Sequence, residues 1–385
     1  MEVVGDDLLQ GHMRVKVKRK WMLIFAAVML FARLSMGASP SPKGIASFQE
    51  TGSAQAELKE AIALTRSGHF SEAIPRLVAL QGRVTDEFAV KFNLALCYIA
   101  TGEPDKSIPI LQALPEDPRR GSGVDNLLAQ AYIATGRAEE AFIALKRAAR
   151  ITPSAEKLFL YIADACMAYQ DYSSGLKAMN LGIQQLPNSA SLHYEKAVFL
   201  SLLDEFDVAK NEFDQSRQLA PDEAIGYVAS AHKHMLEGDL ISAIKVAREG
   251  VLKKRANYLL WTFLGQALMR AGATPGSSDF AEARASLEQA VAERANSADS
   301  RISLAKLYVM EGHLPEAIQQ LEAARQLEPR SAAVYANLGN AYRRMGKVKE
   351  AEGALAALHT INQEQVARIA NAPGDRKAGY GRTPN

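Results

Sequence analysis

A turn position recurs every 34 residues through most of this chain, and it is glycine at seven of its nine occurrences. The positions are Gly68, Gly102, Gly136, Gln170, Asp204, Gly238, Gly272, Gly312 and Gly346. One step, from Gly272 to Gly312, is 40 residues long. A period of this size indicates supersecondary units that bury their apolar faces against one another by stacking.

Small residues recur at two fixed places around each turn. Seven positions before it lie Ala61, Ala95, Ala129, Ala163, Ala197, Ala231, Gly265, Ala305 and Gly339. After it come Ala73, Ser107, Ala141, Gly175, Ala209, Ala243, Ala283, Ala317 and Ala351. A side chain no larger than a methyl group lets two helix backbones cross closely, while large neighbours such as Tyr98 and Leu321 fill the remaining space. Each unit is therefore predicted to be two short amphipathic helices joined at the turn.

The period and these positions resemble the tetratricopeptide repeat family. Pro153, Pro187, Pro221 and Pro329 close four of the units, where proline ends a helix at little cost. The resemblance implies an all-α, right-handed superhelical solenoid of stacked antiparallel helix pairs over residues 54–370. The expected repeats are 54–87, 88–121, 122–155, 156–189, 190–223, 224–257, 258–297, 298–331 and 332–365, followed by a helical extension.

The N-terminal region has the layout of a secretory signal peptide. A basic stretch from Arg14 to Lys20 precedes an apolar run from Trp21 to Ala32, and small residues follow. The run is shorter than the ~20 residues that span a bilayer. Residues 1–38 are predicted to be the signal peptide, with Met13 as an alternative start, and an uncleaved membrane anchor is the alternative reading. The protein is thus expected to be exported, to a bacterial periplasm or envelope.

Three further segments carry expectations of their own. Residues 39–53, rich in Ser, Pro and Gly, are predicted to be a flexible spacer, and residues 371–385 a disordered tail. Residues 273–280 lengthen one repeat and are predicted to form a loop between its helices, so that removing residues 274–279 is expected to leave stability nearly unaltered. The two cysteines, Cys97 and Cys166, fall at packing positions in different repeats and are expected to be unpaired core residues.

No pattern in the sequence predicts a catalytic, cofactor-binding or metal-binding site. It contains no phosphate-binding loop, no zinc-ligand spacing and no nucleophile elbow, so we expect no enzyme activity, no cofactor and no metal site. His232 and His234 are two positions apart on a predicted helix and point in different directions, which argues against a shared metal ion. The net charge is only +2 and the aromatics occupy packing positions, so nucleic-acid binding is not expected.

The family resemblance implies a concave binding surface made by the first helix of each repeat. Carried onto this sequence, an apolar zone would contain Leu58, Ile62, Phe92, Leu96 and Ile99. A polar and basic zone would contain Lys306, Asn337, Asn340 and Arg343, with Tyr194 between the two zones. An apolar groove accepts an amphipathic helix or an apolar peptide, and a basic end suits a carboxylate.

These observations predict an exported scaffold or adaptor that binds protein or peptide partners and supports assembly of an envelope complex. Two alternatives stay open: a substrate-recognition or accessory subunit of a separate envelope enzyme, and a membrane-anchored assembly factor. Membrane contact is expected only if residues 13–38 stay uncleaved.

Overall fold

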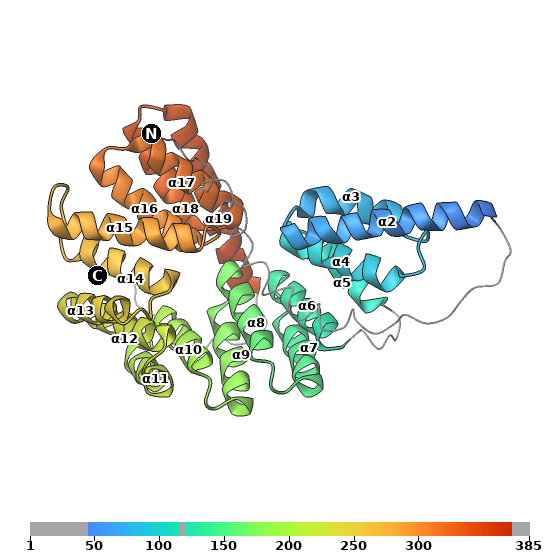
Figure 1. Ribbon diagram of the computed structural model, residues 1–385, viewed down its shortest axis with the longest axis horizontal. Coiled ribbons are helices and arrows are strands. Elements are labelled where there is room, and N and C mark those ends of the chain that lie inside the picture. Colours follow the sequence, from blue (N-terminus) through green and yellow to red (C-terminus); the bar gives the residue numbers. More distant parts are fainter. Residues whose placement is uncertain (1–44, 115–120, 372–385) are drawn as a thin grey trace, which may run out of the picture. The chain divides into compact units, whose positions relative to one another are not determined.

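The computed structural model describes residues 45–114 and 121–371, and within these ranges it contains 18 α-helices and no strand (Figure 1). The predicted all-α solenoid of helix pairs is confirmed. The predicted signal peptide and the tail from residue 372 lie outside the described residues, as do residues 115–120. Among the described helices, none combines the length and the apolar character needed to cross a membrane.

The chain divides into two compact units, Met1–Thr101 and Gly102–Asn385. The described helices of unit 1 are α2 (Ile45–Ser67), α3 (Phe70–Leu80) and α4 (Glu87–Ala100). The division falls inside the repeat expected at 88–121, between its two helices. In unit 1 helix α4 packs against α3, whereas α5 (Pro104–Gln112) packs against α6 (Gly121–Ala134) in unit 2.

Unit 2 continues as regular helix pairs, which Figure 1 shows in order from green to red. They are α7 (Ala138–Ile151), α8 (Glu156–Tyr169), α9 (Tyr172–Gln185), α10 (Ala190–Leu202), α11 (Phe206–Leu219), α12 (Ala224–Glu237), α13 (Leu240–Leu252), α14 (Tyr258–Arg270), α15 (Ser278–Glu293), α16 (Ala298–Glu311), α17 (Leu314–Leu327), α18 (Ala332–Arg344) and α19 (Val348–Asn371). Each first helix contacts its own second helix and the first helix of the next pair. The last helix, α19, includes the predicted extension as one continuous segment.

The turns between paired helices have the left-handed backbone that glycine adopts without strain. Gly238 and Gly312 have φ of 77° and 84°. Gln170 and Asp204, which replace glycine in two repeats, take the same conformation with φ of 56° and 62°. The repeat geometry therefore overrides the steric preference of these two residues, and the turn persists without glycine.

The small positions before the turns are buried between crossing helices, as predicted. Ala61, Ala95 and Ala129 are each 0% exposed. At Gly265 in α14, an added Cβ would lie 2.5 Å from Leu287 Cγ of α15. Cys97 and Cys166 are buried and unpaired, again as predicted. These residues stabilise the stack through packing.

Residues 39–53 were predicted to be a flexible spacer, but this segment is helical from Ile45, where α2 begins. The prolines of this stretch, Pro40 and Pro42, both precede Ile45, so nothing after them removes a backbone donor from the helix. The Ser and Gly residues that suggested flexibility lower helix propensity without preventing a helix.

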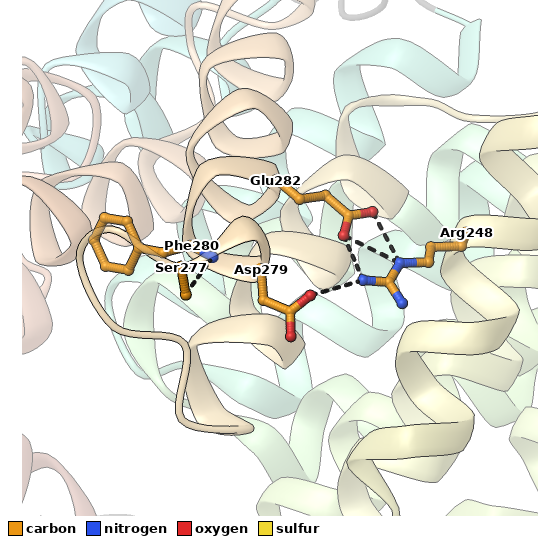
Figure 2. Close-up of polar contacts among 5 residues, drawn as sticks. All are labelled: Arg248, Ser277, Asp279, Phe280 and Glu282. Carbon is orange, nitrogen blue, oxygen red and sulfur yellow. Dashed lines mark hydrogen bonds and ion pairs between the residues drawn. The ribbon is translucent and has the colours of Figure 1, made fainter.

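The insertion at 273–280 is buried at its two ends and mostly exposed between them. Ala273 is 7% and Phe280 2% exposed, and Ser277 Oγ accepts a hydrogen bond from Phe280 N at 3.2 Å (Figure 2). Asp279 and Glu282 both bind Arg248 of α13, in the preceding repeat. Part of the insertion thus caps and extends α15, and the effect of removing residues 274–279 on stability stays a prediction.

Candidate functional site

The first helices of unit 2 form one continuous surface, which we call the inner face. It is made by α6, α8, α10, α12, α14, α16 and α18, each of which contacts the next in this series. The second helices cover the opposite side. Side chains that the first helices do not use for packing are therefore gathered on a single surface.

The predicted apolar zone lies in unit 1 and is only partly available. Leu58 and Leu96 are 2% and 6% exposed, so they belong to the core, which corrects their assignment as partner-binding residues. Their predicted role in binding rested on their position in the repeat alone. The structure buries both side chains among α2, α3 and α4. Ile62, Phe92 and Ile99 are half-buried. Phe92 stacks on Phe88 with ring centroids 5.9 Å apart.

Tyr194 is also a packing residue and not a free binding residue. It is 6% exposed, and its hydroxyl oxygen lies 3.3 Å from Nδ1 of His232 in α12. The His232 ring lies between Phe213 and Phe263, with centroids 4.7 Å from each. Burial lowers the pKa of His232 to about 4, with a smaller contribution from the nearby Arg270. This histidine is therefore neutral and acts as part of an aromatic cluster.

The predicted polar and basic zone is exposed on the inner face. Lys306 of α16 and Asn340 and Arg343 of α18 are all exposed, and neither cation forms an ion pair with any described residue. Asn337 is half-buried, and its side-chain amide donates to the carbonyl of Ala333 at 2.7 Å. Three of the four predicted residues are thus free to meet a partner.

Carboxyl groups on the same face were not predicted as site residues. Asp164 and Asp299 are exposed and Glu195 is half-buried. Burial raises the pKa of Asp164 to about 6 and that of Glu195 to about 8, where Asp164 adds a like charge. Asp164 occupies an inward position in the repeat pattern, but no sequence signal distinguishes Glu195.

The inner face brings residues from distant repeats together. The guanidinium carbon of Arg330, just before α18, lies 5.8 Å from the ring centroid of Tyr169 at the end of α8. Arg330 also pairs with Glu364 of α19. Four repeats separate these elements in the sequence, so the stack of unit 2 curls back toward its own beginning.

A separate cavity of about 450 Å³ lies between α13, α14 and α15. Arg248 and Glu282 line one part of it, and Leu252, Trp261 and Leu264 line another. Within residues 45–114 and 121–371, no group of three His, Cys, Asp or Glu side chains is arranged to hold a metal ion.

The chain matches two protein-family models, each described as a tetratricopeptide repeat. One matches residues 64–131, 276–324 and 309–372, and the other residues 126–154. No curated protein matches the chain.

Several solved structures are similar. YrrB, described as a TPR protein with an unusual peptide-binding site, is 20% identical, covers 51% of this chain and 97% of its own, and has a TM-score of 0.33. A TPR protein from Parabacteroides merdae is 13% identical over 65% of this chain and 97% of its own, with a TM-score of 0.45. MamA is 19% identical over 44% of this chain and 95% of its own, with a TM-score of 0.35.

Proposed function

Because the chain belongs to the tetratricopeptide repeat family, we propose that it is a scaffold that binds a protein or peptide partner on the inner face of unit 2. The observation that carries the proposal is the exposed, unpaired set of Lys306, Asn340 and Arg343 on adjacent first helices. Side chains held on neighbouring helices of a packed stack are pre-positioned, so a partner loses little free energy in ordering them. The mixture of cations, amides and apolar groups suits a polypeptide better than a single small ligand.

A second contact region is proposed in unit 1. Ile62, Phe92 and Ile99 leave part of their side chains accessible, although Leu58 and Leu96 do not. These residues suit the apolar side chains of a partner, as when an amphipathic helix lays its apolar face in a hydrophobic groove.

We further propose that the protein acts in the cell envelope after export, as an adaptor in the assembly of an envelope complex. The support is in the sequence: the basic residues 14–20, the apolar run 21–32 and the small residues after it. A role as the recognition subunit of a separate enzyme would use the same inner face, so the identity of the captured partner decides between them.

The test is site-specific photo-crosslinking in cells that make the full chain. A photoreactive residue is placed at Lys306 or Arg343 on the inner face, and at Ile241 of α13, which is 83% exposed on a second helix, as the matched control. We expect a discrete crosslinked partner from 306 and 343 and none from 241. Equal crosslinking from all three positions, or none from the inner face, would contradict the scaffold proposal. The N-terminus of the recovered protein shows whether residues 1–38 have been removed.

A further inference from the structure

The contact between Arg330 and Tyr169 joins two parts of unit 2 that lie several repeats apart in the sequence. Tyr169 is the last residue of α8, and Arg330 lies two residues before α18 begins at Ala332. The guanidinium carbon of Arg330 is 5.8 Å from the centre of the tyrosine ring, within the range of a cation–π interaction. Successive first helices meet in order along the stack, whereas this contact crosses directly from an early repeat to the last one.

The loop that carries Arg330 is held in place by its own hydrogen bonds. The backbone N–H of Ser331 donates to the carbonyl oxygen of Glu328 at 3.1 Å. The hydroxyl of Tyr335 in α18 donates to the carbonyl oxygen of Pro329 at 3.0 Å. The loop is therefore fixed to α18, and Arg330 projects from a rigid base toward α8.

The last helix supplies a carboxylate that orients Arg330. Helix α19 has 24 residues, whereas α17, the second helix of the preceding repeat, has 14, and Glu364 lies in the additional length. An Nη2 group of Arg330 donates to the carboxylate of Glu364. A carboxylate that binds one edge of a guanidinium fixes the direction of its plane, and the plane can then stack on an aromatic ring. The additional length of α19 thus helps to present Arg330 to Tyr169.

This join is weaker than the joins between successive repeats. The side chains of Arg330 and Glu364 are 42% and 48% exposed, so water and salt compete with both interactions. Successive helix pairs instead share buried apolar clusters, with residues such as Leu264 in one cluster and Leu338 in another. The Arg330–Tyr169 contact can therefore break while each helix pair stays packed against its neighbours.

We propose that Arg330, Tyr169 and Glu364 form a latch that holds unit 2 closed and limits access to its inner face. The partner-binding residues Asn340 and Arg343 lie on α18, directly after the latch loop, so the binding surface moves when the latch opens. A polypeptide partner reaches the inner face in the open form, and the latch sets how much of that form is present. The inference rests on the proposed scaffold function and adds how access to its surface is regulated.

The direct test measures opening in the full chain without a partner. Spin labels are attached through the substitutions Lys157→Cys in α8 and Ala333→Cys in α18, both at exposed positions, while the two native cysteines are buried. Double electron–electron resonance then gives the distances between the labels. We expect Arg330→Ala to raise the share of long distances about two- to fivefold, which corresponds to the loss of one exposed cation–π contact. A distribution identical to that of the unaltered latch would overturn the proposal.

Further variants assign the effect to the latch residues. Arg325→Ala is the matched control, because Arg325 is 45% exposed and pairs with Glu322 at 2.7 Å within α17, and it should leave the distances unchanged. Tyr169→Phe keeps the ring and should keep the latch closed, whereas Tyr169→Leu should open it. An Arg325→Ala effect as large as that of Arg330→Ala, or equal distances for phenylalanine and leucine at 169, would contradict the assignment. Glu364→Gln should open the latch by less than Arg330→Ala, and no shift at all would remove Glu364 from it.

Access to the inner face is measured separately. Ala336 is exposed and lies four positions before Asn340 on the same side of α18, so Ala336→Cys reports on this surface. The rates of reaction with N-ethylmaleimide and with a maleimide carried by a polyethylene glycol chain are compared. We expect Arg330→Ala to raise the rate with the large reagent about two- to fivefold and to leave the rate with the small reagent unchanged. An unchanged rate with the large reagent would overturn the control of access. Neither experiment uses a partner, so the latch can fail while photo-crosslinking from Lys306 still supports the scaffold function.

Discussion

Gly265 of α14 and Leu287 of α15 approach so closely that a methyl group on Gly265 would lie 2.5 Å from Leu287 Cγ and 3.1 Å from the carbonyl oxygen of Ala283. Leu287 is 0% exposed and belongs to a continuous apolar cluster in the unit 2 core. The repeat places a small residue here because the two helix backbones cross at this point.

We expect Gly265→Ala to destabilise the protein by about 1–3 kcal/mol, because overpacking exceeds the gain in helix propensity. Gly339→Ala is the matched control at the same repeat position. There the nearest atom to an added Cβ is Leu355 Cδ2 at 3.1 Å, and Leu355 is 42% exposed and able to move. Urea denaturation of the two variants measures the difference, and equal losses would contradict the packing argument.

Gln170 ends α8 in the left-handed conformation, with φ of 56° and ψ of 30°. Replacement by glycine should stabilise the protein by about 1 kcal/mol, since glycine adopts this backbone without steric cost. Gly312→Ala, at the same position of a later repeat with φ of 84°, should lower stability by a similar amount. Thermal unfolding of both variants provides the check, and a stabilising alanine at 312 would be inconsistent with the backbone explanation.

Phe280 anchors the lengthened repeat, because its side chain is 2% exposed at the start of α15. We expect Phe280→Ala to reduce the free energy of unfolding by about 3–5 kcal/mol through loss of burial and formation of a cavity. Ile241→Ala is the control, since Ile241 is 83% exposed, and its effect should stay within about 0.5 kcal/mol. A small effect of the phenylalanine substitution would contradict the anchoring role of Phe280.

His232 should make stability depend on pH in the acidic range. Its pKa is lowered to about 4 in the folded protein, mainly by burial, while an unfolded chain protonates histidine near its ordinary value of about 6.5. The unfolded state therefore binds more protons between these values, and stability falls as the pH drops, by at most about 1.4 kcal/mol per pH unit.

The measurement compares the free energy of unfolding of the unaltered protein and of His232→Phe at about pH 7 and about pH 5. Glu195 and Asp164 shift in the opposite sense, because their raised pKa values make the folded state gain stability as the pH falls. Their contribution is common to both proteins and cancels in the difference. We expect the unaltered protein to lose more stability on acidification than the variant, and parallel pH curves would exclude a buried neutral His232.

The sequence predicted the repeat fold because each repeat is specified locally. The 34-residue period, the turn positions such as Gly312 and the small residues such as Ala305 each act within one helix pair or between neighbours. Cys97 and Cys166 could be assigned to the core by the same reasoning, since packing positions follow from the helical period. Only the edges differed: α2 extends into the expected spacer, and Ser277 and Phe280 of the insertion join α15.

The binding surface depended on tertiary structure. Register places Leu58, Leu96, Tyr194, Lys306 and Arg343 at inward positions of the repeat, yet only the two cations are exposed, because neighbouring helices cover the other three. The approach of Arg330 to the ring of Tyr169 depends on a small rotation accumulated over several repeats. No local pattern encodes that sum, since each step is set by side-chain packing at every interface along the stack. The sequence by itself determined what kind of repeat this protein is built from, and the tertiary structure decided which inward side chains stay exposed and which distant repeats come into contact.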